Sequence, residues 1–226
     1  MAIQPVNENL LEKIDSYIED LFIPSDPALE QNLVDAKAAG LPPIAVAPAQ
    51  GRMMYLLAKM AGAKRILEIG LLGGYSTTLL ARALPENGKL ISLELKQSNA
   101  DVARKNIDRA GIGNRVEIRV GPASETLTKM IAAKEDPFDF VFIDADKTGY
   151  IGYLNQVLQL SRPGTIILSD NLIRHGSVLP DNPNPDADAR AIAEFNKLIA
   201  AHPRLESVLL PIVKGKIDGM AISLVK

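Results

Sequence analysis

Residues 65–76, RILEIGLLGGYS, combine the features of a buried strand, a glycine turn and the start of a helix. The apolar residues of RILEI are typical of a strand buried in a parallel sheet, and the glycines after it allow a sharp turn. From Thr77 the apolar residues return at helical spacing. Backbone N–H groups in such a turn, and the positive end of the helix, face the crevice above the sheet. The stretch therefore predicts a nucleotide-type site on a doubly wound α/β fold.

Two positions near this turn bear on which nucleotide would bind. The dinucleotide fingerprint G-x-G-x-x-G needs a glycine two residues after Gly70, where this chain has Leu72. The next expected strand ends near Glu94, and a carboxylate at that position can bind both hydroxyls of a ribose. These features predict an adenosine-type ligand and leave NAD and S-adenosylmethionine open, although Leu72 weakens the case for NAD.

Composition favours one domain over the whole chain, 1–226, because 226 residues with 47% hydrophobic residues suit a single α/β core. The net charge is −2 and no block of lysine or arginine occurs, so nucleic acid is not an expected partner. The chain has no cysteine, which excludes disulfides and thiolate metal sites. Because the sequence shows neither a signal peptide nor a membrane-spanning stretch, we expect a cytoplasmic protein with no membrane partner.

Strands and helices alternate after a helical extension at residues 1–62, and the sheet core is expected at 63–226. Three helices are expected in the extension, at 7–22, 26–40 and 48–60, and the start of the third, around Val46, is a candidate ligand contact. Seven strands are expected at 65–69, 89–95, 115–121, 138–144, 165–170, 205–213 and 220–225. The alternation predicts a mostly parallel sheet, closed by an antiparallel C-terminal hairpin with its turn at 214–219.

Acidic residues stand at the ends of two expected strands. Asp144 follows FVFI, and Asp170 with Asn171 follows TIILS. If these strands are neighbours, their side chains meet at one edge of the sheet, and an all-oxygen set suits magnesium, calcium or manganese rather than zinc. Either aspartate alone is explained as a cap of the following helix, but the three residues together favour a divalent cation.

Lys147 lies three residues after Asp144, in DADKTGY. A nearby dication disfavours the ammonium form of a lysine, so Lys147 is a candidate base, whereas a lone loop lysine is ordinarily a solvated charge. His175 receives no role. With only two histidines in the chain, a serine–histidine triad is poorly supported.

Three stretches, LEIGLLGGYST, FVFIDADKTGY and LSDNLIRHGSV, together resemble the cation-dependent class I O-methyltransferases of the caffeoyl-CoA and catechol O-methyltransferase family, the small bacterial members in particular. The resemblance runs from the third helix to the C-terminus. It implies S-adenosylmethionine as cofactor, a Rossmann-like seven-stranded sheet whose last strand is antiparallel, and a homodimer.

The resemblance also implies roles for individual residues. The methionine part of the cofactor would be surrounded by Glu68, Gly70, Leu72, Gly74 and Ser76. Further cofactor contacts would come from Val46, from Glu94 on the ribose, from Ala123 at the adenine and from Asp144. The metal ligands would be Asp144, Asp170 and Asn171, and the general base would be Lys147.

The chain departs from the mammalian catechol enzymes at the substrate wall. They have tryptophan just before the base, whereas this chain has Asp146 and no tryptophan, and residues 176–187 offer no match for their substrate-binding glutamate. The predicted function is divalent-cation-dependent methyl transfer, with Mg²⁺ as the first choice, to a hydroxyl of a small aromatic vicinal diol. The alternatives are a tRNA hydroxyuridine O-methyltransferase, a nicotinamide-dependent dehydrogenase and, more weakly, an inactive binding module.

Overall fold

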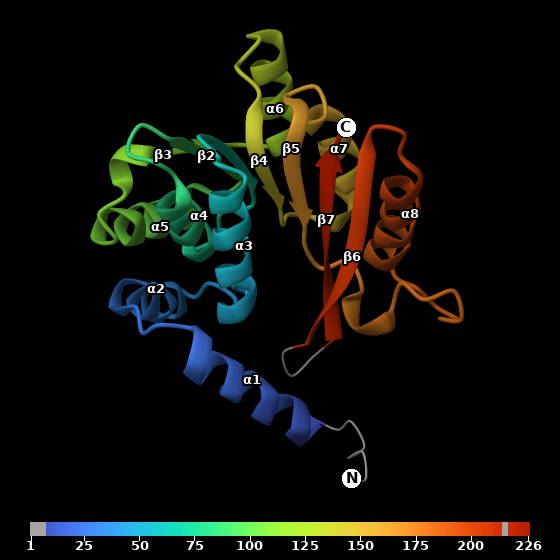
Figure 1. Cartoon of the computed structure of the whole chain (residues 1–226), viewed down its shortest axis with the longest axis horizontal. Coiled ribbons are helices and arrows are strands. Elements are labelled where there is room, and N and C mark those ends of the chain that lie inside the picture. Colours follow the sequence, from blue (N-terminus) through green and yellow to red (C-terminus); the bar gives the residue numbers. More distant parts are fainter. Residues whose placement is uncertain (1–7, 214–216) are drawn as a thin grey trace.

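The structure is a computed structural model that describes residues 8–213 and 217–226 (Figure 1). Three helices precede the sheet: α1 (Glu8–Phe22), α2 (Pro27–Ala38) and α3 (Pro48–Met60). α2 begins where the sequence indicates, because Asp26 accepts hydrogen bonds from the backbone N–H groups of Ala28 and Leu29 and Pro27 fills the first turn. Within the described residues, none of the helices is long and apolar enough to cross a membrane.

The sheet has seven strands in the order β3-β2-β1-β4-β5-β7-β6. Its strands are β1 (Arg65–Ile69), β2 (Lys89–Glu94), β3 (Val116–Val120), β4 (Phe138–Ile143), β5 (Ser161–Ser169), β6 (Leu205–Val213) and β7 (Ile217–Val225). β1 to β5 pair in parallel, while β7 lies between β5 and β6 and is antiparallel to both. The predicted fold class, a doubly wound and mostly parallel seven-stranded sheet with an antiparallel C-terminal strand, is therefore confirmed.

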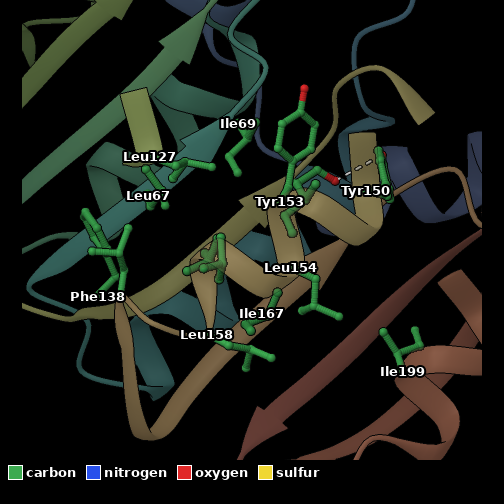
Figure 2. Packing of buried hydrophobic residues seen from close by; sticks show 14 of the residues in the cluster. Leu67, Ile69, Leu127, Phe138, Tyr150, Tyr153, Leu154, Leu158, Ile167 and Ile199 are labelled. Carbon is green, nitrogen blue, oxygen red and sulfur yellow. Dashed lines mark hydrogen bonds between the residues drawn. The ribbon is translucent and has the colours of Figure 1, made fainter. Parts of the chain in front are cut away.

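Helices cover both faces of the sheet. The crossover helices are α4 (Tyr75–Ala83), α5 (Gln97–Arg109), α6 (Ala123–Ala132), α7 (Tyr150–Val157) and α8 (Ala187–Ala201), with short 3₁₀ turns η1 (Gly113–Arg115), η2 (Lys147–Gly149) and η3 (Arg174–Gly176). Side chains of α6, α7 and α8 share one buried cluster with one face of the strands, which Figure 2 shows in part. Those of α2 to α5 share a second cluster with the other face.

Strand residues alternate between these two clusters. In β1, Leu67 and Ile69 belong to the first cluster and Ile66 to the second, and all three are fully buried. A parallel strand with both faces covered by helices is expected to be apolar throughout, as RILEI nearly is. The exception in this strand, Glu68, is also buried, and its partners belong to the site described below.

Two strands start more than one residue away from the prediction. β5 starts at Ser161 rather than at 165. Its register with β4 shifts between Phe138, which pairs with Ser161, and Phe140, which pairs with Ile166, so the strand includes the turn residues Pro163 and Gly164. β7 starts at Ile217 rather than at 220, so Asp218 and Gly219 lie in the strand and not in the hairpin turn. Residues 214–216 of the predicted turn, and residue 7 of the first predicted helix, lie outside the described residues.

Candidate active site

A cavity of about 1640 Å³ opens at the carboxyl ends of β1, β2, β4 and β5. This is the point where the strand order reverses, between β1 and β4, and ligands of doubly wound sheets bind there. Most of the predicted site residues line it: Val46, Gly70, Leu72, Ser76, Glu94, Ala123, Asp144, Lys147, Asp170 and Asn171. The other two predicted residues, Glu68 and Gly74, do not line the cavity and lie behind its wall.

The glycine turn after β1 is shaped by contact with the neighbouring strand. Gly70 has φ +103°, and a Cβ atom there would lie 1.9 Å from the backbone oxygen of Asp144, so any side chain would push β1 and β4 apart. Leu72 also has a positive φ, of 49°, although it stands where the dinucleotide fingerprint has glycine. Gly74, with φ +82°, faces Ala103 of α5 and lets α4 pack closely on α5. Residues 70–73 of this turn line the cavity.

Glu94 closes the end of β2 and holds the glycine turn. Its Oε2 accepts hydrogen bonds from the backbone N–H groups of Leu71 and Leu72, at 3.3 and 3.0 Å. Its Oε1 accepts from the backbone N–H of Lys96 and from the side chain of Asn99, both at 3.0 Å. These four donors already fill the roughly four acceptor positions of the carboxylate, so a ribose would have to share the oxygens with the turn or displace a donor.

Glu68 lies under the turn and has three hydroxyl partners. Ser76, Thr77 and Ser92 donate to its carboxyl oxygens at 2.6, 2.5 and 2.6 Å. Burial raises the pKa of Glu68 to about 7, although these three hydrogen bonds oppose the shift. Glu68 is thus connected to the cavity through the Ser76 hydroxyl, since Ser76 does line it.

Asp144 and Asp170 meet because β4 and β5 are adjacent and parallel, with Ile143 opposite Ser169. Burial, followed by the charge of nearby Asp144, raises the pKa of Asp170 well above its usual range. Asn171, the next residue, has φ 60° and also lines the cavity. Two carboxylates that repel each other beside an amide form an all-oxygen set, and a bound divalent cation would relieve the repulsion, so these residues fit such an ion.

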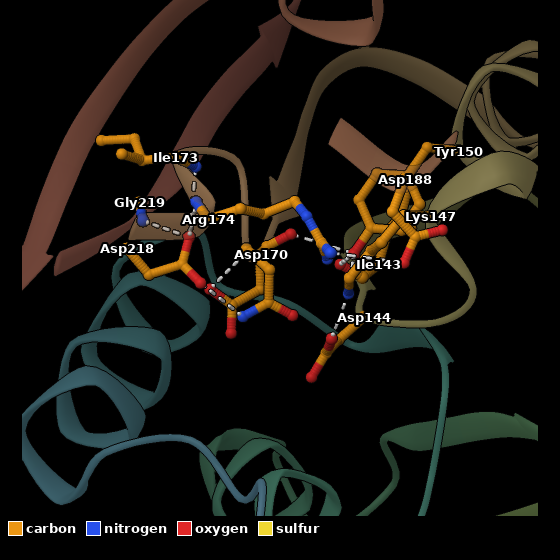
Figure 3. Close-up of polar contacts among 11 residues, drawn as sticks. Ile143, Asp144, Lys147, Tyr150, Asp170, Ile173, Arg174, Asp188, Asp218 and Gly219 are labelled. Atoms are coloured by element: carbon orange, nitrogen blue, oxygen red, sulfur yellow. Dashed lines mark hydrogen bonds and ion pairs between the residues drawn. The ribbon is translucent and has the colours of Figure 1, made fainter. Parts of the chain in front are cut away.

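Lys147 begins the turn that follows β4 and reaches back to the strand end (Figure 3). Its Nζ donates to Asp144 Oδ1 at 3.0 Å and to the hydroxyl of Tyr150 at 2.9 Å. The Tyr150 hydroxyl in turn donates to the backbone oxygen of Asp170 at 2.9 Å. Burial, and then the charges of Asp144 and Asp170, raise the pKa of Tyr150, so its hydroxyl keeps its proton and holds the lysine in place.

The structure adds residues that the sequence analysis did not identify. Asp218 of β7 lines the cavity and accepts a hydrogen bond from the Asn171 side chain at 3.2 Å. Gln50 of α3 also lines the cavity, is 7% exposed and lies beside Asp170, where its side-chain amide favours the charged form of that carboxylate. Arg174 and His175 line the mouth of the cavity, where Arg174 pairs with Asp186 and Asp188. Asp218 was missed because Asp-Gly indicates a turn, and Gln50 because it belongs to no motif.

The fold and the site define a doubly wound α/β protein with a nucleotide-type cavity at the switch point of its sheet. The sequence matches the O-methyltransferase family over residues 25–224. It is 45% identical to a catechol O-methyltransferase of Niastella koreensis, over 98% of this chain and 100% of that one. It is 41% identical to a catechol O-methyltransferase of Mycobacterium tuberculosis, over 94% and 95% of the two chains.

A solved structure agrees with this match. The O-methyltransferase from Bacillus cereus in complex with SAH has a TM-score of 0.93 and 43% identity, covering 97% of this chain and 100% of that one. The chain therefore belongs to the O-methyltransferase family and is a methyltransferase enzyme. The resemblance inferred from the three sequence stretches is confirmed.

Proposed function

We propose that this enzyme transfers a methyl group from S-adenosylmethionine to one hydroxyl of a small aromatic vicinal diol, with the help of a divalent cation. The observation that carries the proposal is the meeting of Asp144, Lys147, Asp170 and Asn171 in the same cavity as the glycine turn. Two relatives are named catechol O-methyltransferases and a structural neighbour holds SAH, which supports both the substrate class and the cofactor.

The cofactor would lie along the glycine turn. Gly70 and Leu72 offer backbone at the cavity wall, Ser76 offers a hydroxyl supported by Glu68, and Glu94 offers carboxylate oxygens to the ribose. Val46 and Ala123 line the two sides of the same cavity and would contact the methionine part and the adenine. When bound, S-adenosylmethionine supplies the methyl group on a positively charged sulfur.

The cation would be held by Asp144, Asp170 and Asn171, and Mg²⁺ is the ion that we favour over Ca²⁺ and Mn²⁺. When bound, the ion supplies positive charge that lowers the pKa of the diol hydroxyls. Lys147 Nζ then accepts the proton of the hydroxyl to be methylated, while Tyr150 keeps Nζ at the edge of the cavity. Positioning of the oxygen for attack and displacement of water by the bound substrate would assist a reaction that neutralises opposite charges.

The charges at the mouth favour a small substrate over RNA. Asp181, Asp186 and Asp188 line this end of the cavity, and the positive charge of Arg174 is balanced by two of them. A phosphate backbone would be repelled there, because RNA binding draws its affinity from unpaired lysine and arginine. This observation disfavours the tRNA alternative, and membership of the O-methyltransferase family disfavours the dehydrogenase.

Methyl transfer from radiolabelled S-adenosylmethionine tests the proposal. We expect label in catechol and in caffeate-type diols with Mg²⁺ present, none after exhaustive chelation, and recovery when Mg²⁺ is returned. Asp170→Ala and Asn171→Ala should each abolish transfer but still bind cofactor by calorimetry, because the glycine turn lies on another strand. Transfer that survives chelation would refute the role of the cation, and label found in bulk tRNA but not in diols would refute the substrate class.

A further inference from the structure

We propose that Asp218 is a positioning residue: it turns the side-chain amide of Asn171 so that the amide oxygen faces the cavity, and it thereby sets the affinity of the cation site. The inference rests on the proposed function, because it takes Asn171 as a ligand of the cation. It concerns a residue that comes from the antiparallel strand β7, far from Asn171 along the chain.

Asp218 uses its two oxygens for different purposes (Figure 3). Oδ1 accepts three backbone N–H groups, from Ile173 at 3.1 Å, Arg174 at 2.9 Å and Gly219 at 2.8 Å. Oδ2 accepts one side-chain hydrogen bond, from Asn171 Nδ2 at 3.2 Å. One oxygen therefore holds the loop after β5, and the other contacts only the amide among the hydrogen bonds that the described residues show.

The chemistry of these groups fixes which way the amide points. The oxygen and nitrogen of an asparagine side chain are nearly the same in shape, so packing alone does not choose between its two orientations. A carboxylate only accepts hydrogen bonds, whereas the amide nitrogen only donates. The nitrogen must therefore face Asp218, and the oxygen is directed to the other side, where Asn171 lines the cavity.

The backbone of Asn171 is already held, which leaves the amide as the remaining variable. Its N–H donates to Asp170 Oδ1 at 2.8 Å, and its φ of 60° is a conformation that asparagine and aspartate adopt more readily than most residues. If the amide were reversed, its N–H groups would point at the cation and repel it. Partners behind metal ligands that fix ligand orientation typically change metal affinity about 10- to 100-fold when they are removed.

Asp218→Asn separates this role from the structural one. The asparagine oxygen can still accept the three backbone N–H groups that Oδ1 accepts now. Its nitrogen then faces Asn171, which must reverse its own amide and turn Nδ2 toward the cavity. We expect Mn²⁺ affinity of the cofactor-free protein, measured by electron paramagnetic resonance, to fall about 10- to 100-fold. The melting temperature and the affinity for S-adenosylmethionine should stay near those of the unmodified protein.

The exchange Asn171→Asp with Asp218→Asn should restore Mn²⁺ binding. An aspartate at 171 has an oxygen on both sides, so it can accept from the new amide and still face the ion. The exchange also keeps the net charge, so its recovery alone does not separate orientation from charge. For that separation, Asp218→Asn is compared in two backgrounds: with Asn171 present and with Asn171→Ala, where no amide remains to reverse.

We expect a large loss of Mn²⁺ affinity from Asp218→Asn with Asn171 present, and a loss of less than about threefold in the Asn171→Ala background, since only a change of charge remains there. Equal losses in both backgrounds would show that Asp218 acts through charge and would overturn the inference. Unchanged affinity in Asp218→Asn would overturn it as well, while leaving the proposed function standing. If the unmodified protein binds no Mn²⁺, the proposed cation site fails and the inference fails with it.

Discussion

Lys147 is either a solvated loop charge or the general base, and the two roles predict very different effects of its removal. Its side chain is only 11% exposed and has two partners, Asp144 and Tyr150, so it is not a solvated loop charge. We expect Lys147→Met to lower turnover on a catechol by about 10²- to 10⁴-fold, the range for loss of a general acid–base group. Steady-state methyl transfer at neutral pH measures this, with calorimetry to show that cofactor affinity is retained.

Lys129→Met is the matched control, because Lys129 is exposed on α6 and does not line the cavity. It should change turnover and stability little, as most surface substitutions do. A pH series completes the test, since hydroxide can replace a missing base and the deficit of Lys147→Met should shrink as pH rises. Unimpaired turnover of Lys147→Met at neutral pH would remove the lysine from the mechanism.

Gly70 tests whether the close approach of the glycine turn to β4 leaves room for even one Cβ atom. Gly70→Ala places that atom 1.9 Å from the Asp144 backbone oxygen and demands a left-handed φ of +103°, so we expect a loss of more than about 1 kcal/mol of stability and weaker cofactor binding. Gly152→Ala is the control, because Gly152 lies in α7 with no atom near its missing Cβ. That change should stabilise the protein by up to about 1 kcal/mol. Urea unfolding of both variants decides the matter, and equal stabilities would contradict the packing argument.

The site was predictable from sequence where a residue follows directly from a strand end. Asp144, Asp170 and Asn171 meet because their strands are neighbours in a parallel sheet, the condition on which the sequence analysis made their meeting depend. Residues that reach the site from elsewhere gave no such signal: Asp218 arrives on β7, whose register depends on a hairpin. The placement of Glu68 and Gly74 behind the wall depends on side-chain packing, and their contact with a cofactor stays a prediction.

One carboxylate joins three strands at their amino-terminal ends, on the side of the sheet away from the cavity. Asp139 of β4 accepts from the backbone N–H groups of Lys64 and Arg65 at the start of β1, at 2.8 and 2.9 Å, and from Arg162 of β5 at 2.5 Å. Burial alone would raise the pKa of Asp139, but these donors outweigh it and lower the pKa. The carboxylate therefore aligns the beginnings of β1, β4 and β5, whose ends carry the site.

Asp139→Ala should cost about 1–3 kcal/mol of stability at pH 7, the effect of leaving buried or charged hydrogen-bond partners unpaired. Because the folded pKa lies below the unfolded value, this contribution is present above the unfolded pKa of about 3.8 and is lost as pH falls through the folded pKa. Unfolding by urea from pH 7 to pH 3 should thus show the two proteins converging toward acid. A difference in stability that stays constant or grows toward acid would reverse the sign and refute the assignment.

Whole elements were predicted more reliably than their boundaries. The order of helices and strands follows from apolar periodicity, and all seven strands formed where the sequence places them to within a few residues. The start of β5 was wrong because Pro163 and Gly164 are turn residues, and the pairing opposite Phe138 overrides them. Such an irregularity depends on the partner strand, which lies far away in sequence.

At the scale of the whole molecule, α1 leaves an apolar surface uncovered. It contacts α3, but Tyr17, Leu21 and Phe22 are 65%, 60% and 66% exposed, and Phe22 borders an apolar groove between the two helices. In Figure 1 this helix lies apart from the sheet. An apolar surface of this kind favours a second copy of the chain, so we expect a homodimer.

Sedimentation at micromolar concentration should therefore give the mass of two chains. Leu21→Asp should shift the mass toward one chain, because it places a charge in the apolar surface. Ser16→Asp adds the same charge on the exposed opposite side of α1 and should leave the dimer intact. A single-chain mass for the unmodified protein would refute the dimer.

The division of the chain into one domain, 1–226, with a helical extension at 1–62 and a sheet core at 63–226, stays a prediction.

The position of β7 between β5 and β6 has a consequence for how the protein folds during its synthesis. A ribosome makes β6 before β7, yet the neighbour of β6 in the sheet is β7 alone. While β7 is still unmade, the edge of β5 is open, and β6 could occupy it in the direction of the parallel strands, a misassembly that transient open edges invite. The native strand order therefore requires that β7, and not β6, pairs with the edge of β5. Because Asp218 arrives on the same strand, the corner that orients Asn171 is completed only in this late event.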